Sequence, residues 1–93
     1  MGIIFDVVYH TAVVAEDIPK LSSQDRMRVK RSIEEKLKTK PEVFGKPLRR
    51  SLKGYRKLRV GDLRIVFRIE RRIVKIFCIG HRSIIYRKAA KRN

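Results

Sequence analysis

The sequence predicts an α+β domain in which two N-terminal helices pack on one face of a small antiparallel sheet. Two observations carry this prediction. Apolar and polar residues alternate over residues 55–60 and 63–70, which is the period of a β-strand. Residues 22–38 repeat apolar side chains at helical spacing. The resulting order is one strand, two helices, three strands and a short C-terminal helix or strand, and it fits a single domain over residues 1–93.

The first elements are a strand and a short helix. Residues 2–9 are β-branched and aromatic, which favours a strand. In the segment that follows, Val14, Ile18 and Leu21 have helical spacing, and Pro19 is expected to kink or end the helix. The sequence thus predicts a strand that leads directly into a helix.

A stronger helix is predicted over residues 22–38. Ser22 or Ser23 can cap its first turn with a hydroxyl oxygen. Its expected buried stripe consists of Val29, Ile33 and Leu37. Residues 41–55 contain two of the three prolines and two of the five glycines, so a connecting segment is expected there.

The last three strands begin with a hairpin, residues 55–60 and 63–70, closed by a tight turn at residues 61–62. Because the helices take the apolar side of the sheet, we expect the other side to be open and concave. Alternation directs the following side chains to that side: Lys57, Arg59, Arg64 and Arg68. Arg59 and Arg64 face each other with like charge, which destabilises a sheet and indicates a function.

The charge of the chain is uneven. Its formal net charge is +16, of which residues 1–46 contribute +2 and residues 47–93 contribute +14. Self-repulsion on this scale is normally tolerated for a polyanionic partner. The alternative is a basic surface that serves only solubility.

Several classes of protein are not expected from the composition. No apolar run approaches the roughly 20 residues of a membrane span, so no membrane partner is predicted. The lone Cys78 lies in an apolar strand, is expected to be a small core residue, and fits a reducing, cytoplasmic location. His10 and His81 make no zinc pattern, and there is no phosphate-binding glycine loop. We therefore predict no metal and no cofactor.

The segment GHRSIIY, residues 80–86, can complete a site for phosphodiester chemistry. It supplies His81, Arg82 and Tyr86 next to the basic strands. Guanidinium groups bind phosphate oxygens and stabilise charge in the transition state, and a tyrosine ring can stack on an unpaired base. Two alternatives stay open at this point. His81 can be purely structural, and Tyr86 can pack in the core.

The stretch FGKPLRRSLKGYRKLRVGDLRIVFRI, followed by IGHRSIIY, closely resembles the RelE branch of the RelE/ParE toxin superfamily of type II toxin–antitoxin modules. The resemblance implies the RelE/ParE toxin fold and a toxin that cuts messenger RNA in the ribosomal A site. The ribose 2′-hydroxyl would attack the adjacent phosphate and leave a cyclic phosphate. The implied partners are the ribosome, mRNA and a cognate antitoxin whose acidic, partly disordered segment wraps the toxin.

The resemblance also implies roles for individual residues. Lys57 and Arg59 match the proton acceptor and the transition-state stabiliser, in either order. Arg64 matches the arginine that grips the scissile phosphate. Arg82 matches the proton donor or leaving-group stabiliser, and Tyr86 the tyrosine that stacks on or orients the substrate nucleotide.

Four points qualify the resemblance. Arg82 and Tyr86 are four positions apart, closer than in some active members, and His81 raises the possibility of a histidine general base. The ParE branch shares the fold, poisons DNA gyrase and generally lacks this basic set, so a gyrase poison is one alternative. A catalytically inactive RNA- or ribosome-binding relative is another. Further RNA contacts are predicted at Arg56, Arg68, Lys53 and Arg87.

Overall fold

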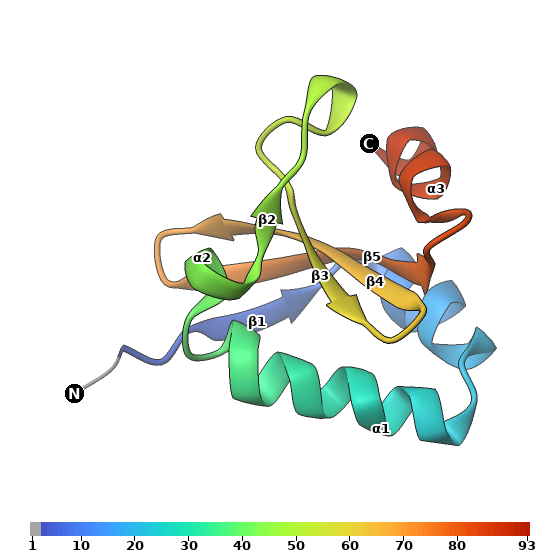
Figure 1. The fold of residues 1–93 in the computed structure, drawn as a ribbon, viewed down its shortest axis with the longest axis horizontal. Coiled ribbons are helices and arrows are strands. Elements are labelled where there is room, and N and C mark those ends of the chain that lie inside the picture. The colour runs from blue at the N-terminus through green and yellow to red at the C-terminus, as the bar shows by residue number, and fades with distance from the viewer. Residues whose placement is uncertain (1–2) are drawn as a thin grey trace.

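The computed structural model describes residues 3–93 as an α+β fold with a five-stranded mixed sheet (Figure 1). The strands have the order β1-β5-β4-β3-β2 in the sheet. Their bounds are β1 Asp6–Tyr9, β2 Lys46–Pro47, β3 Arg56–Val60, β4 Leu63–Glu70 and β5 Ile73–His81. The α-helices are α1 Ser23–Ser32, α2 Pro41–Phe44 and α3 Ile85–Arg92. The α+β class predicted from the sequence is confirmed.

The strand pairing is antiparallel from β2 to β5, whereas β1 pairs with β5 in parallel, with Asp6 opposite Ile73. The sheet is therefore mixed and not purely antiparallel. Strand β2 was not predicted; it lies in the proline-containing connection and pairs with only two residues of β3. A register shift after Val66 places Val66 opposite Cys78 but Phe67 opposite Ile76.

The N-terminal segment differs in detail from the prediction. Of the strand expected over residues 2–9, residue 2 lies outside the described residues and the strand begins at Asp6. A π-helical segment, Val13–Asp17, and a 3-10 turn, Ile18–Lys20, follow it. Val14 is 58% exposed although it has helical spacing with Ile18 and Leu21; the neighbouring Val13 is buried instead. The face of this helix that meets the core thus passes through residues 13 and 17.

The second helical segment follows the prediction closely. The Ser22 hydroxyl accepts a hydrogen bond from the backbone N–H of Asp25 at 3.1 Å, which caps α1. The predicted stripe is confirmed, because Val29, Ile33 and Leu37 are all buried. A π-helical turn, Ile33–Leu37, extends α1.

Apolar side chains form one cluster on each side of the sheet. The larger cluster joins α1 to β3, β4 and β5. The second joins α3 to the opposite side and consists of Leu52, Val66, Phe77, Cys78, Ile85 and Ala89. The expectation that this second side is open is therefore wrong over its central part, because the C-terminal segment folds back as a helix and covers Val66 and Cys78. Basic side chains on this side stay at least partly exposed on both flanks of the covered part, Arg59 and Arg64 near the β3–β4 turn and Arg68 near the β4–β5 turn.

Candidate active site

Three cations project from the β3–β4 hairpin on the α3 side of the sheet. We call Lys57, Arg59 and Arg64 the hairpin cluster. The register places Lys57 opposite the buried Val66, and Arg59 directly opposite Arg64, as predicted. The Gly61–Asp62 turn between them uses a positive φ of 60° at Gly61, which glycine adopts at little cost. The tight turn thus brings like charges together.

The hairpin cluster borders a hollow of about 340 Å³, which we call the site hollow. One nitrogen of Arg64, Nη1, donates hydrogen bonds to the carbonyl oxygens of Gly61 at 3.0 Å and Leu63 at 2.8 Å, which holds the guanidinium at the turn. The site hollow is lined by Lys36, Phe44, Lys46, Lys57, Leu58, Arg59 and Arg64. None of these lining residues is acidic, so the cations can bind an anion from outside.

Tyr86 belongs to the same group. It lies in the first turn of α3, and its ring centroid is 5.6 Å from Lys57 Nζ, which is a cation–π contact. The neighbouring Ile85 is buried in the second apolar cluster, whereas Tyr86 is 36% exposed. Tyr86 is therefore a surface aromatic beside the hairpin cluster and not a core residue.

Arg82 lies beside the hairpin turn. Its backbone N–H donates to the carbonyl oxygen of Asp62 at 2.8 Å, and its Nε is 3.9 Å from Asp62 Oδ1. Both side chains are well exposed, and an exposed ion pair at this distance contributes little. The Arg82 guanidinium thus stays free to meet a ligand at the same end of the sheet.

His81 is placed differently. It pairs with Leu63, whose side chain belongs to the apolar cluster on the α1 side, so alternation directs His81 away from Arg64. Its ring atom Nδ1 accepts the backbone N–H of Ser83 at 3.1 Å and lies 2.7 Å from the Ser83 hydroxyl oxygen. The structure thus gives His81 a local partner and does not bring it into the hairpin cluster.

The four further RNA contacts predicted from the sequence do not lie together. Arg56 projects on the α1 side, where its guanidinium donates to the carbonyl oxygen of Gly45 at 2.9 Å at the end of α2. Arg68 contacts Glu70 at 2.5 Å. Lys53 and Arg87 are exposed, Lys53 before β3 and Arg87 next to Tyr86. Arg56 and Arg87 are chain neighbours of Lys57 and Tyr86, but the Arg56 guanidinium is turned to the other side of the sheet.

Sequence reasoning missed a buried ion cluster beneath α3. Asp17 is 1% exposed and accepts hydrogen bonds from Arg92 at 2.7 and 3.1 Å, from Lys88 at 2.5 Å and from the Ile79 N–H at 2.9 Å. Burial alone would raise the pKa of Asp17, but the hydrogen bonds from Arg92 and Lys88 outweigh burial and hold it below its ordinary value. The one available signal was an aspartate four positions after Val13, on the same helical face.

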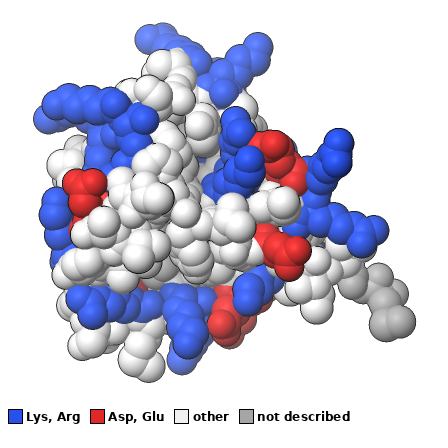
Figure 2. Space-filling view, turned by 180° about the vertical axis from the view of Figure 1, so that it is seen from behind, with Lys and Arg blue, Asp and Glu red and all other residues white. Residues whose placement is uncertain are grey.

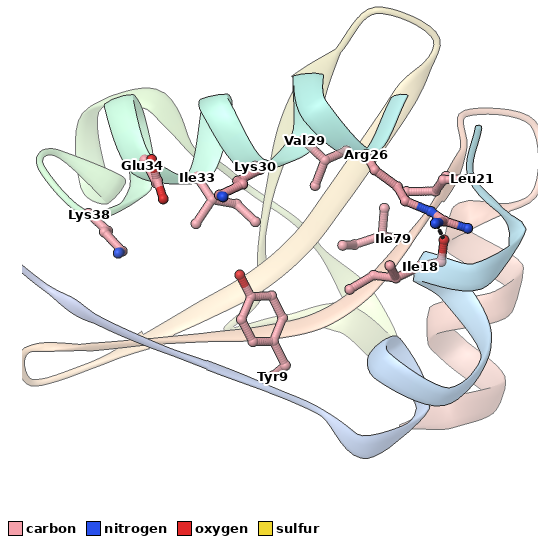
Figure 3. A pocket seen from close by; sticks show the side chains of 10 residues that line it. All are labelled: Tyr9, Ile18, Leu21, Arg26, Val29, Lys30, Ile33, Glu34, Lys38 and Ile79. Carbon is pink, nitrogen blue, oxygen red and sulfur yellow. Dashed lines mark hydrogen bonds between the residues drawn. The ribbon is translucent and has the colours of Figure 1, made fainter. Parts of the chain in front are cut away.

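Cys78 and the cavity beside Tyr9 are not part of the candidate site. Cys78 is buried, and burial with the nearby Asp17 carboxylate raises its pKa to about 11, which confirms it as a core residue. Tyr9 points from β1 toward α1 across an apolar cavity of about 310 Å³ (Figure 3), and none of the predicted site residues lines this cavity.

Surface charge is mixed elsewhere on the molecule. Figure 2 shows the face seen from behind, where acidic side chains stand among lysines and arginines around an uncharged centre. Over residues 3–93 there is no group of three or more His, Cys, Asp or Glu side chains that could hold a metal ion. None of the helices described is long and apolar enough to cross a membrane.

Comparison with known proteins gives the family. The family model described as the ParE toxin of the type II toxin–antitoxin system, parDE, matches residues 11–86. A chain of the RelBE2 toxin–antitoxin complex from Mycobacterium tuberculosis is 31% identical, with 85% of this chain and 99% of that chain covered and a TM-score of 0.79. No curated protein matches the chain.

Two further solved structures share the fold. They are HP0894 from Helicobacter pylori, at 12% identity over 86% of this chain and 97% of that chain with a TM-score of 0.64, and YafQ from E. coli, at 19% identity over 85% and 94% with a TM-score of 0.56. The family model and the 31% identical RelBE2 chain define a toxin of the type II toxin–antitoxin class. The chain belongs to the RelE/ParE superfamily.

Proposed function

We propose that this toxin is a ribosome-dependent endoribonuclease that cleaves mRNA in the ribosomal A site. The observation that carries the proposal is the hairpin cluster next to Tyr86, in a hollow lined by no acidic residue. Cations without a carboxylate partner can bind the scissile phosphate and stabilise charge that develops on it. Tyr86 offers a ring on which the substrate base can stack.

The residues divide the reaction between them. The 2′-hydroxyl gives its proton to a base as its oxygen bonds to the adjacent phosphorus, the bond from phosphorus to the 5′-oxygen breaks, and that oxygen takes up a proton from water, which leaves a 2′,3′-cyclic phosphate. A guanidinium does not release its proton in proteins, whereas an amine can, so we assign Lys57 as the proton acceptor. Arg59 and Arg64 bind the phosphate oxygens, and Arg82 stabilises the leaving oxygen.

The ribosome would contribute the alignment. The hairpin cluster contains no paired general acid and base of the usual kind, so much of the rate must come from holding hydroxyl and phosphate in line. Such positioning can contribute up to about 7–11 kcal/mol. We therefore infer that free RNA is cut poorly and that messages in translating ribosomes are cut at defined codon positions.

We further propose a cognate antitoxin as the cellular partner. The similar Mycobacterium tuberculosis chain was solved in a toxin–antitoxin complex. A net charge of +16 favours a partner segment rich in carboxylates that orders on binding. Because this attraction is electrostatic, the complex should weaken as salt rises.

The second candidate function is poisoning of DNA gyrase, favoured by the match to the ParE toxin family model. The two functions separate on induction of the toxin in cells. Gyrase poisoning gives DNA breaks and a damage response, whereas mRNA cleavage stops translation and leaves truncated messages.

A direct test maps cuts by primer extension on a message that is translated in a purified system and on the same message without ribosomes. We expect codon-positioned cuts only with ribosomes. Arg64→Ala should strongly reduce these cuts, whereas Arg72→Ala, which changes an exposed arginine in the β4–β5 turn, should keep them. Equal cleavage of free and ribosome-bound message would overturn the proposal.

A further inference from the structure

A second basic hollow adjoins the site hollow. It measures about 490 Å³ and lies between α1 and the β3–β4 turn; we call it the α1 hollow. It is lined by Gln24, Met27, Arg28, Arg31, Ser32, Lys36, Arg59, Val60 and Gly61. Lys36 and Arg59 also line the site hollow. The two hollows therefore adjoin at Lys36 and Arg59, and together we call them the groove, which leads from the hairpin cluster onto α1.

The groove is lined by cations and by no acidic residue. Its basic residues are Arg28, Arg31, Lys36, Lys46, Lys57, Arg59 and Arg64. The acidic residues Glu34 and Glu35, which continue the same helical segment, line a neighbouring hollow that shares Met27 and Arg31 with the α1 hollow. These carboxylates thus lie next to the groove, beyond Arg31, and do not line it.

The backbone leaves room for a chain to pass along this groove. Strand β2 pairs only with Arg56 and Lys57, so no strand of the sheet covers the edge of β3 from Leu58 to Val60. The β3–β4 turn lies over α1 (Figure 1), and Arg28 Nη1 comes within 3.8 Å of the position that a Cβ atom would take at Gly61. Arg28 therefore reaches the turn that carries the cluster.

An aromatic ring lies in the same groove. Phe44 is 41% exposed, lines the site hollow, and has Lys36 Nζ at 5.5 Å from its ring centroid. Single-stranded nucleic acid binds where a cationic track meets exposed rings, because phosphates take the cations and bases stack on the rings. An acidic peptide would use the cations but has no comparable need of the ring.

We propose that the message continues from the scissile phosphate through this groove as a single strand, with Arg28 and Arg31 binding its backbone phosphates. The inference deepens the proposed nuclease function and rests on it. It assigns to α1 a role in holding substrate that the sequence did not reveal, since Arg28 and Arg31 are 26 and more positions before the nearest residue of the hairpin cluster.

The test measures binding of RNA oligonucleotides that carry a 2′-deoxy sugar at the site of attack and cannot be cut. Lengths of roughly 4 and roughly 12 nucleotides distinguish the site from the extended groove. Each phosphate contact on a single strand contributes about 0.7 to the slope of log K against log salt. Arg28→Gln/Arg31→Gln should lower that slope by about 1.4 for the longer oligonucleotide and leave the shorter one unchanged.

The matched control is Lys30→Gln/Arg72→Gln, which removes the same charge outside the groove. It should keep the wild-type slope for both lengths, and thermal unfolding should show both double variants folded. Three results would overturn the inference: equal slopes in the groove and control variants, an equal loss for a blunt RNA duplex, or a loss confined to binding of an acidic peptide. The binding assay needs no cleavage, so it tests the groove separately from the nuclease function. If the groove variants lose the predicted slope but the toxin cuts no message on ribosomes, the nuclease function is refuted and binding of RNA in the groove is still supported.

Discussion

The arginines at the two ends of strand β4 have different charged neighbours. At one end Arg64 faces Arg59, and the site hollow beside them has no acidic lining residue. At the other end Arg68 contacts Glu70 at 2.5 Å, and Lys75 contacts the same carboxylate at 2.8 Å. Both arginines leave the strand on the same side, so the strand itself does not explain the difference.

The buried ion cluster beneath α3 resembles the Glu70 end of β4, because its cations also contact a carboxylate. Lys88 and Arg92 both contact Asp17. In both of these places a carboxylate neutralises the cations, whereas the hollow at the hairpin cluster has no acidic lining residue. The comparison teaches that two facing arginines beside a hollow without a carboxylate, and not the number of cations alone, distinguish the site.

The largest expected effect is at the buried carboxylate. Asp17→Asn should lower the free energy of unfolding by about 3–5 kcal/mol, because Lys88 and Arg92 would stay partly buried without a counter-charge. Urea denaturation measures the change, with the exposed Glu35→Gln as control. A change under about 1 kcal/mol would mean that α3 is held by its apolar contacts alone.

The same carboxylate should make stability depend on pH. Its pKa is lowered in the folded state, so its contribution is present above the unfolded pKa of about 4 and is lost as pH falls through the folded pKa. The stability difference between wild type and Asp17→Asn should therefore shrink in acid. A difference that stayed constant from neutral pH to well below 4 would show that Asp17 keeps the same pKa on unfolding.

The next largest effect is on activity and concerns Arg64, at the end of β4 next to the β3–β4 turn. Arg64→Ala should lower the rate of message cleavage on ribosomes by about 10²–10³-fold, the usual result of removing one group that stabilises transition-state charge. The melting temperature should hold or rise slightly, because the facing Arg59 loses a like-charged neighbour. Loss of rate together with loss of folding would assign Arg64 to structure instead.

The smallest effect is expected at the end of β4 where Glu70 contacts Arg68 and Lys75. Glu70→Gln should leave both the melting temperature and the cleavage rate close to wild type, because its ion pairs are exposed and screened. The Glu70 carboxylate is charged at neutral pH in the wild type, since hydrogen bonding to Lys75 lowers its pKa. A clear change in cleavage rate would extend the site along β4 to Arg68.

The sequence predicted those parts of the fold whose signal is local. Alternation in β3 and β4, the glycine turn and the capped helix α1 are all read from neighbours within a few positions. The parallel pairing of β1 with β5 and the two-residue strand β2 depend on distant contacts that periodicity does not encode. The covering of Val66 by α3 was not predicted for the same reason, because the sequence predicted only a short C-terminal helix or strand and not where it packs.

The candidate site shows the same limit. Pleating alone grouped Lys57, Arg59 and Arg64 and separated Arg56 from them, although Arg56 was still expected at the RNA surface. The contact between Lys57 and Tyr86 required the path of the C-terminal segment. Asp17 and Arg92 are 75 positions apart, so no local pattern could join them.

Pairing the first strand with the fifth has a consequence for synthesis of the toxin. Residues 6–9 have no place in a sheet until residues 73–76 have been made, and Asp17 must wait for Lys88 and Arg92. A growing chain therefore stays incomplete, and Tyr86 unplaced, until translation has passed these positions. The proposed nuclease site is therefore incomplete during most of the synthesis of the chain.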